Sequence, residues 1–86
     1  MSAWKKTRQK LLLGVSDVDV DFESICTMLL RLGFQERRGK GSHRIFFRAG
    51  IQEIINLQPI GGKGKAYQMK QIREILLKYK LTQDED

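Results

Sequence analysis

The chain alternates between stretches in which apolar residues recur every three or four positions and short stretches rich in β-branched and aromatic residues. The first spacing is typical of a helix with one buried side, and the second is typical of strands. The predicted elements, in chain order, are a helix over 22–32, strands over 34–38, 43–48 and 51–57, and a helix over 66–79. This order predicts an α+β domain in which a three-stranded antiparallel sheet carries two helices on one face.

The segments outside this pattern are shorter and more polar. Residues 4–13 can form an extra helix that ends at Gly14. Three aspartates between 17 and 21 favour the entrance of a helix over a strand, because carboxylates cap free N–H groups. Pro59 and the glycines after it predict a long flexible loop. The chain is therefore read as a single domain, with an N-terminal extension over 1–16, a core over 17–81 and a flexible acidic tail over 82–86.

The charge is positive and unevenly placed. The net charge is +6, and residues 31–80 hold twelve of the sixteen lysines and arginines but three of the ten acidic residues. A compact domain with such an excess favours polyanions, because neutralising phosphates releases condensed counterions. The structural alternative is that the lysines only keep a small protein in solution.

One cysteine, Cys26, cannot form an internal disulfide, which fits a reducing cytoplasm. The apolar run after the basic residues at the N-terminus is broken by Gly14, Ser16 and Asp17, so it does not resemble a signal peptide, and no stretch is long enough to span a membrane. The sequence predicts a cytoplasmic protein.

His43 is the single histidine, and its imidazole is the side chain whose unperturbed pKa lies nearest neutrality. It opens a predicted strand directly after a basic, glycine-rich turn. Alternation along that strand puts His43, Ile45 and Phe47 on one side and Arg44 and Phe46 on the other. The first side is the more apolar, so the structural alternative is a histidine at the edge of the core.

The segment Gly41-Ser42-His43-Arg44-Ile45-Phe46 resembles the Gly-Ser-His-x-x-Phe signature of the HicA-type mRNA interferases, the small toxins of bacterial toxin–antitoxin pairs. Helical patterns precede and follow it as in that family, and the resemblance extends over roughly residues 20–81. Many members carry a Lys-Gly-Thr-Leu-like entrance to the last helix, where this chain has Ala66-Tyr67-Gln68-Met69.

The resemblance implies a double-stranded-RNA-binding-like fold and a metal-independent endoribonuclease in which His43 is catalytic. It also implies a HicB-type antitoxin as partner. The chain itself is not expected to bind DNA directly, but only through this antitoxin. RNA cleavage suits so sparse a site, because the substrate supplies its own nucleophile, the 2′-hydroxyl. The second proton-transfer group can be a lysine, a tyrosine or water. The residues expected to contact RNA are Lys40, Ser42, Arg44, Lys63, Lys65 and Lys70.

Two further readings of the sequence matter for function. A non-catalytic RNA-binding module of the same fold is the main alternative to a nuclease, and a protein-interaction domain is the third possibility. No metal or cofactor is expected: Phe22 and Met28 stand where a calcium loop requires glycine and glutamate, and one cysteine with one histidine cannot hold zinc. Stacking of Trp4, Phe46, Phe47 or Tyr67 on bases is the minority reading, because a small core needs its aromatic residues.

Overall fold

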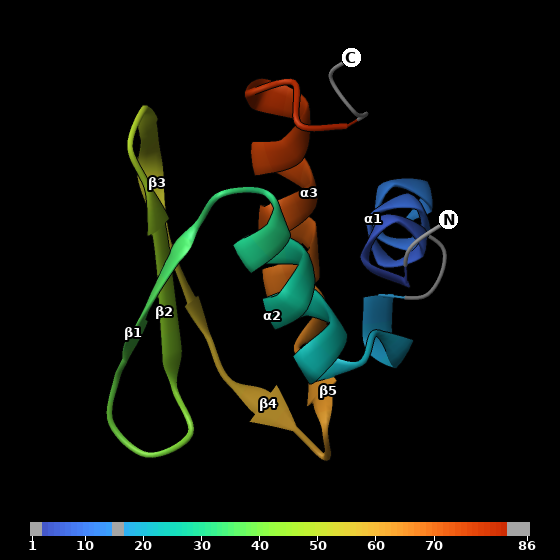
Figure 1. The fold of residues 1–86 in the computed structure, drawn as a ribbon. Coiled ribbons are helices and arrows are strands. Elements are labelled where there is room, and N and C mark those ends of the chain that lie inside the picture. The colour runs from blue at the N-terminus through green and yellow to red at the C-terminus, as the bar shows by residue number, and fades with distance from the viewer. Residues whose placement is uncertain (1–2, 15–16, 83–86) are drawn as a thin grey trace.

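The computed structural model describes residues 3–14 and 17–82 and has an α+β fold with three helices. Its main sheet is antiparallel with strand order β1-β2-β3 (Figure 1). The strands are β1 (Gln35–Arg38), β2 (Arg44–Arg48) and β3 (Ile51–Leu57). The expected three-stranded antiparallel sheet is therefore confirmed, with the first two strands each beginning one residue later than the sequence predicts.

The helices lie in two layers beside this sheet (Figure 1). Helices α2 (Phe22–Arg31) and α3 (Ala66–Lys78) lie on the same side of the sheet, and α1 (Ala3–Leu13) packs against them from outside. The helix expected over 4–13 is thus present. Its Leu11 is fully buried in the common core, so α1 contributes to the same packed unit.

The segment before α2 holds that helix and the α1–α3 layer in place. Asp21 caps α2, because its carboxylate accepts a hydrogen bond from the Ser24 N–H at 3.0 Å. Asp17 lies in a short 3-10 turn (Asp17–Asp19) and accepts two hydrogen bonds from Arg73, at 2.9 and 3.0 Å. The expected capping of a helix entrance is therefore confirmed for Asp21, whereas Asp17 instead pairs with an arginine. Arg73 thereby joins α3 to this turn.

The loop expected after Pro59 is a small second sheet. Strands β4 (Pro59–Ile60) and β5 (Lys63–Gly64) pair in antiparallel fashion, and Lys63 also bridges to Asp21. The prediction of a long flexible loop is wrong, because the glycines between these strands make a tight turn with positive φ at Gly61 and Gly62. The acidic tail expected over 82–86 lies, apart from Thr82, outside the described residues.

The core lies on the opposite side of β2 from the one its composition suggests. Phe46 is fully buried, whereas Ile45 and Phe47 are half-buried on the sheet face that no helix covers. The more apolar side of the strand is therefore not the core side. Phe46 is the buried residue of β2, and Arg44 shares its side because a carboxylate partner is present there.

Candidate functional site

Two glycines shape the turn that presents His43. The turn closes with hydrogen bonds from Gly39 N–H to the His43 carbonyl at 3.0 Å and from His43 N–H to the Lys40 carbonyl at 3.1 Å. Gly41 has φ of +61°, which favours glycine. A Cβ at Gly39 would lie 3.1 Å from the Cβ of His43, so this position leaves room for the histidine.

His43 lies on the open face of the sheet, half-buried, and no residue that the structure describes hydrogen-bonds its imidazole. Its side chain lines a pocket of about 270 Å³ between the edge of β3 and the first turns of α3. The reading of His43 as a histidine at the edge of the core is therefore not favoured, because the core lies on the other face. The other lining residues are Ile54, Asn56, Gln58, Tyr67, Gln68 and Gln71.

Gln68 fixes the wall of this pocket. Its side-chain N–H donates to the Asn56 carbonyl at 2.9 Å, and its side-chain oxygen accepts from the Gln58 N–H at 3.3 Å. Only 4% of Gln68 is exposed, so both ends of its amide are used in tying α3 to the end of β3. The amide therefore holds the backbone on one wall of the pocket in place.

Lys65 reaches the same pocket through Gln58. The Lys65 ammonium donates to the Gln58 side-chain oxygen at 2.8 Å, and the Gln58 side chain lines the pocket with His43. Lys65 is also the N-cap residue of α3. Of the cations expected to contact RNA, Lys65 is thus the one that a described hydrogen bond links to the lining of the His43 pocket.

Arg44 and Ser42 line a different hollow, of about 510 Å³, at the entrance to α2. The Arg44 guanidinium forms a bidentate pair with Glu36, at 2.6 and 2.9 Å, and a further hydrogen bond to Glu23 at 2.8 Å. Its side chain is 14% exposed. Two carboxylates already satisfy this cation on the core side of β2, so the geometry does not favour the expected contact of Arg44 with RNA.

The Glu36–Arg44 pair gives a testable pH dependence. The Arg44 hydrogen bond lowers the pKa of the Glu36 carboxyl below 4.5, so the pair stabilises the fold above that pH and is lost on further acidification. At neutral pH, Glu36→Gln is expected to cost about 1.5 kcal/mol, a low value for charged hydrogen bonds because the pair is partly exposed to solvent. Below pH 4.5 the difference should shrink, as urea unfolding would show.

Glu74→Gln is the matched control, because Glu74 is an exposed carboxylate on α3. Its unfolding free energy should follow the wild type at every pH. A stability difference for Glu36→Gln that stays constant through the acid range would contradict the described pair.

The remaining lysines expected to contact RNA are dispersed. Lys63 pairs with Asp19 at 3.0 Å, beside the small sheet. Lys40 is exposed in the turn before His43. Lys70 is exposed on α3, one helical turn after Tyr67. Lys40 and Lys70 thus flank the pocket region, whereas Lys63 is compensated elsewhere.

The amide residues of the pocket were not anticipated from the sequence. Asn56 and Gln58 are polar residues at alternate positions that share a face with His43, because Ile45 pairs with Asn56. That alternation is a usable signal once the register is known. Tyr67 and Gln71 lie four residues apart on α3, so they occupy one helix face. Arg37, paired with Ile45, adds an exposed cation to the open face of the sheet.

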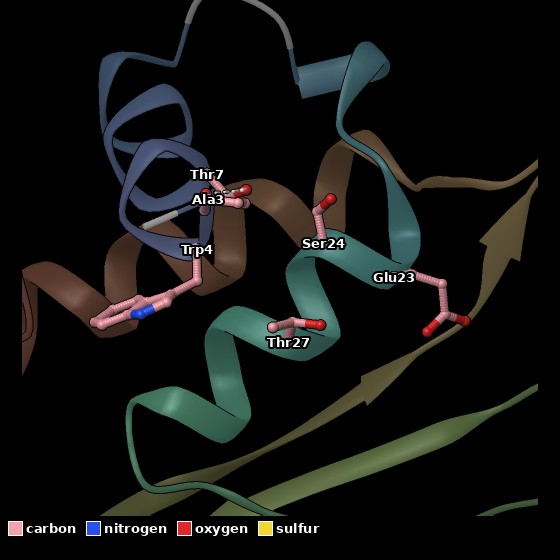
Figure 2. Close-up of a pocket in the computed structure, with 6 residues that line it drawn as sticks. All are labelled: Ala3, Trp4, Thr7, Glu23, Ser24 and Thr27. Atoms are coloured by element: carbon pink, nitrogen blue, oxygen red, sulfur yellow. Dashed lines mark hydrogen bonds between the residues drawn. The ribbon is translucent and has the colours of Figure 1, made fainter. Parts of the chain in front are cut away.

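A third pocket lies between α1 and α2 and is lined by side chains from both helices (Figure 2). Its volume is about 170 Å³, and Glu23 is the one titratable residue in its lining. The Thr7 hydroxyl there already donates to the Ala3 carbonyl at 3.2 Å. This pocket therefore offers less chemistry than the one beside His43.

Neither the cysteine nor the acidic residues form a second reactive centre in the part of the chain that the structure describes. Burial raises the pKa of the Cys26 thiol to about 12, which keeps it protonated and unreactive at neutral pH. Over residues 3–14 and 17–82, no three His, Cys, Asp or Glu side chains gather as metal ligands. No helix among the same residues is long and apolar enough to cross a membrane.

Comparison of the chain with family models, curated proteins and solved structures finds no match in any of the three. The features that bear on function are therefore the short His43 motif, the positive charge and the geometry of the pocket.

Proposed function

We propose that this chain is a metal-independent endoribonuclease of the HicA type, in which His43 transfers a proton during cleavage of RNA. The observation that carries the proposal is the position of His43. The only histidine of the chain lines a polar pocket between the edge of β3 and the first turns of α3, with an imidazole that the core does not use. Its place in the Gly-Ser-His-x-x-Phe segment and the net charge of +6 support the same reading.

The proposed reaction requires no cofactor. His43 accepts the proton of the 2′-hydroxyl, whose oxygen forms a bond to the adjacent phosphorus. The bond from phosphorus to the 5′-oxygen breaks, and that oxygen takes a proton from an acid. The products are a 2′,3′-cyclic phosphate and a 5′-hydroxyl.

Charge on the reacting phosphate needs a cation, and the leaving oxygen needs an acid. We propose Lys65 as this cation, because its ammonium is hydrogen-bonded to Gln58 in the lining of the pocket. The Tyr67 hydroxyl, in the same pocket as His43, and Lys65 are the side chains proposed for the second proton transfer, with water as the third source.

The fold is consistent with this proposal. Without α1 and the small second sheet, the element order is helix, three antiparallel strands and helix, with both helices on one sheet face. A double-stranded-RNA-binding-like fold has this order, and we propose that relationship here. We further propose a HicB-type antitoxin that covers the His43 pocket and presents acidic groups to Arg37 and Lys40.

The direct test is incubation of the purified protein with RNA in EDTA. We expect fragments that carry 5′-hydroxyl ends, detected by end labelling with a kinase, and growth arrest on expression without the antitoxin. Retardation of intact RNA in a gel would instead identify the non-catalytic RNA-binding module. If the protein neither cleaves nor retards RNA, the protein-interaction domain is the remaining alternative.

A further inference from the structure

We propose that the pocket beside His43 binds one unpaired nucleobase of RNA, so that the substrate class is single-stranded RNA. The inference rests on the proposed function for the identity of the ligand as RNA. It concerns the residues that hold the RNA rather than the residue that cleaves it.

Side-chain amides in the pocket are available to form hydrogen bonds with a base. Gln68 is fully used within the protein, and the Gln58 oxygen is taken by Lys65, which leaves the Gln58 NH₂ group available. The side-chain amides of Asn56 and Gln71 make no hydrogen bond to any residue that the structure describes. Each such amide offers donors and an acceptor side by side, which is the pattern that pairs with the edge of a base.

The pocket also contains exposed apolar surfaces on which a base can stack. Tyr67 is 66% exposed and Ile54 is 59% exposed, although both are large apolar side chains. They come from different elements, α3 and β3, and line the same hollow. An aromatic ring at a pocket wall provides a face on which a base can stack, and such stacking contributes about 1–3 kcal/mol per base.

The charge and the volume of the pocket also suit a nucleotide. The lining contains no carboxylate, Lys65 is hydrogen-bonded to its Gln58, and Lys70 follows Tyr67 by one helical turn, so the site suits a base attached to a phosphate chain. Its volume of about 270 Å³ lies just under the range of drug-sized ligand sites, about 300–1,000 Å³, and suits a single nucleotide unit.

An unpaired base is required because a base pair already uses the hydrogen-bonding edge that the amides would contact. A base inside a duplex is also stacked on both faces, so it cannot lie against Tyr67 without leaving the helix. A duplex lying across the open sheet would meet Arg37 and Lys40 but not the interior of the pocket. The pocket therefore distinguishes single strands from duplexes.

The experiment measures binding without cleavage. Wild-type protein and variants are titrated with a labelled 2′-O-methyl RNA of about 12 nucleotides, as a single strand and as a duplex. This RNA lacks the 2′-hydroxyl nucleophile, so affinity is read whether or not the protein is a nuclease. We expect Tyr67→Ala to weaken single-strand binding about ten-fold or more and to change duplex binding less than about two-fold.

Tyr67→Phe retains the ring and should keep the single-strand affinity, and Leu77→Ala, exposed on the same helix, should have no effect. Gln71→Met should alter the order of affinities among homopolymers. On addition of the single strand, the Tyr67 ring resonances should shift. Those of Tyr79, which donates to Glu53 at 2.6 Å, should not.

Each outcome separates this inference from the nuclease proposal. If the wild type does not cleave RNA but Tyr67→Ala loses single-strand affinity, the base pocket stands and the nuclease proposal is rejected. If the wild type cleaves RNA but Tyr67→Ala binds the single strand normally, or if the duplex binds more tightly, the base pocket is rejected. An effect of Tyr67→Ala only on binding of a protein partner would also overturn it, and would assign the pocket to that partner.

Discussion

His43→Ala is expected to lower the rate of RNA cleavage by at least about a hundred-fold while leaving the thermal midpoint of unfolding close to that of the wild type. A positioned general acid or base contributes about 10²- to 10⁴-fold to the rate. Stability should be retained, because the imidazole lies on the uncovered face of the sheet and no described residue hydrogen-bonds it. Single-turnover cleavage and thermal unfolding measured on the same preparation test both statements.

The matched control is Gln35→Ala, an exposed position on the same sheet at the other end of β1. It should cleave RNA at the wild-type rate. Added imidazole should partly restore cleavage by His43→Ala, because a small base can occupy the vacated space, whereas it cannot replace a histidine that only supports the fold. Full activity of a well-folded His43→Ala variant would exclude the proposed mechanism.

Phe46→Ala is expected to destabilise the fold by about 3–5 kcal/mol, the range for loss of a buried aromatic side chain. Phe46 is fully buried between the sheet and the helices, and its neighbours across the strands are Glu36 and Ile55. A domain of this length has a total stability of about 4–13 kcal/mol, so the substitution should remove a large fraction of it. Urea unfolding at low temperature measures the difference.

Phe47→Ala is the control for this prediction, because Phe47 is the neighbouring phenylalanine on the open face of the sheet. It should lose less than half the stability that Phe46→Ala loses. If Phe47→Ala is the more damaging change, β2 presents its other side to the helices. His43 would then lie on the core side, and the structural alternative for the histidine would be correct.

The local pattern along the chain was sufficient for the elements of the main fold. Helical spacing predicted α2 and α3, and glycine-bounded apolar runs predicted three strands, one of them, β3, with the bounds it has in the structure. Such patterns depend on neighbours within a few residues. The small β4–β5 sheet escaped prediction because two-residue strands carry no periodicity.

The side of β2 that faces the core was determined by tertiary packing. His43, Ile45 and Phe47 form the more apolar side by composition, yet the helices cover the side that carries Arg44 and Phe46. An arginine is tolerated there because Glu36, on the neighbouring strand, and Glu23, on α2, neutralise it. Both partners lie on other elements, so composition along one strand cannot reveal them.

The sequence by itself identified His43 as the candidate proton carrier, because that assignment needs only the chemistry of imidazole and the glycine-rich turn before it. The residues that surround His43 were determined only by the tertiary structure. Strand pairing and the position of α3 bring Asn56, Gln58, Tyr67 and Gln71 to one pocket, and they separate Ser42 and Arg44 from it. The physical reason is that adjacent strand residues point to opposite sheet faces, whereas residues far apart in sequence share a face through register and helix packing.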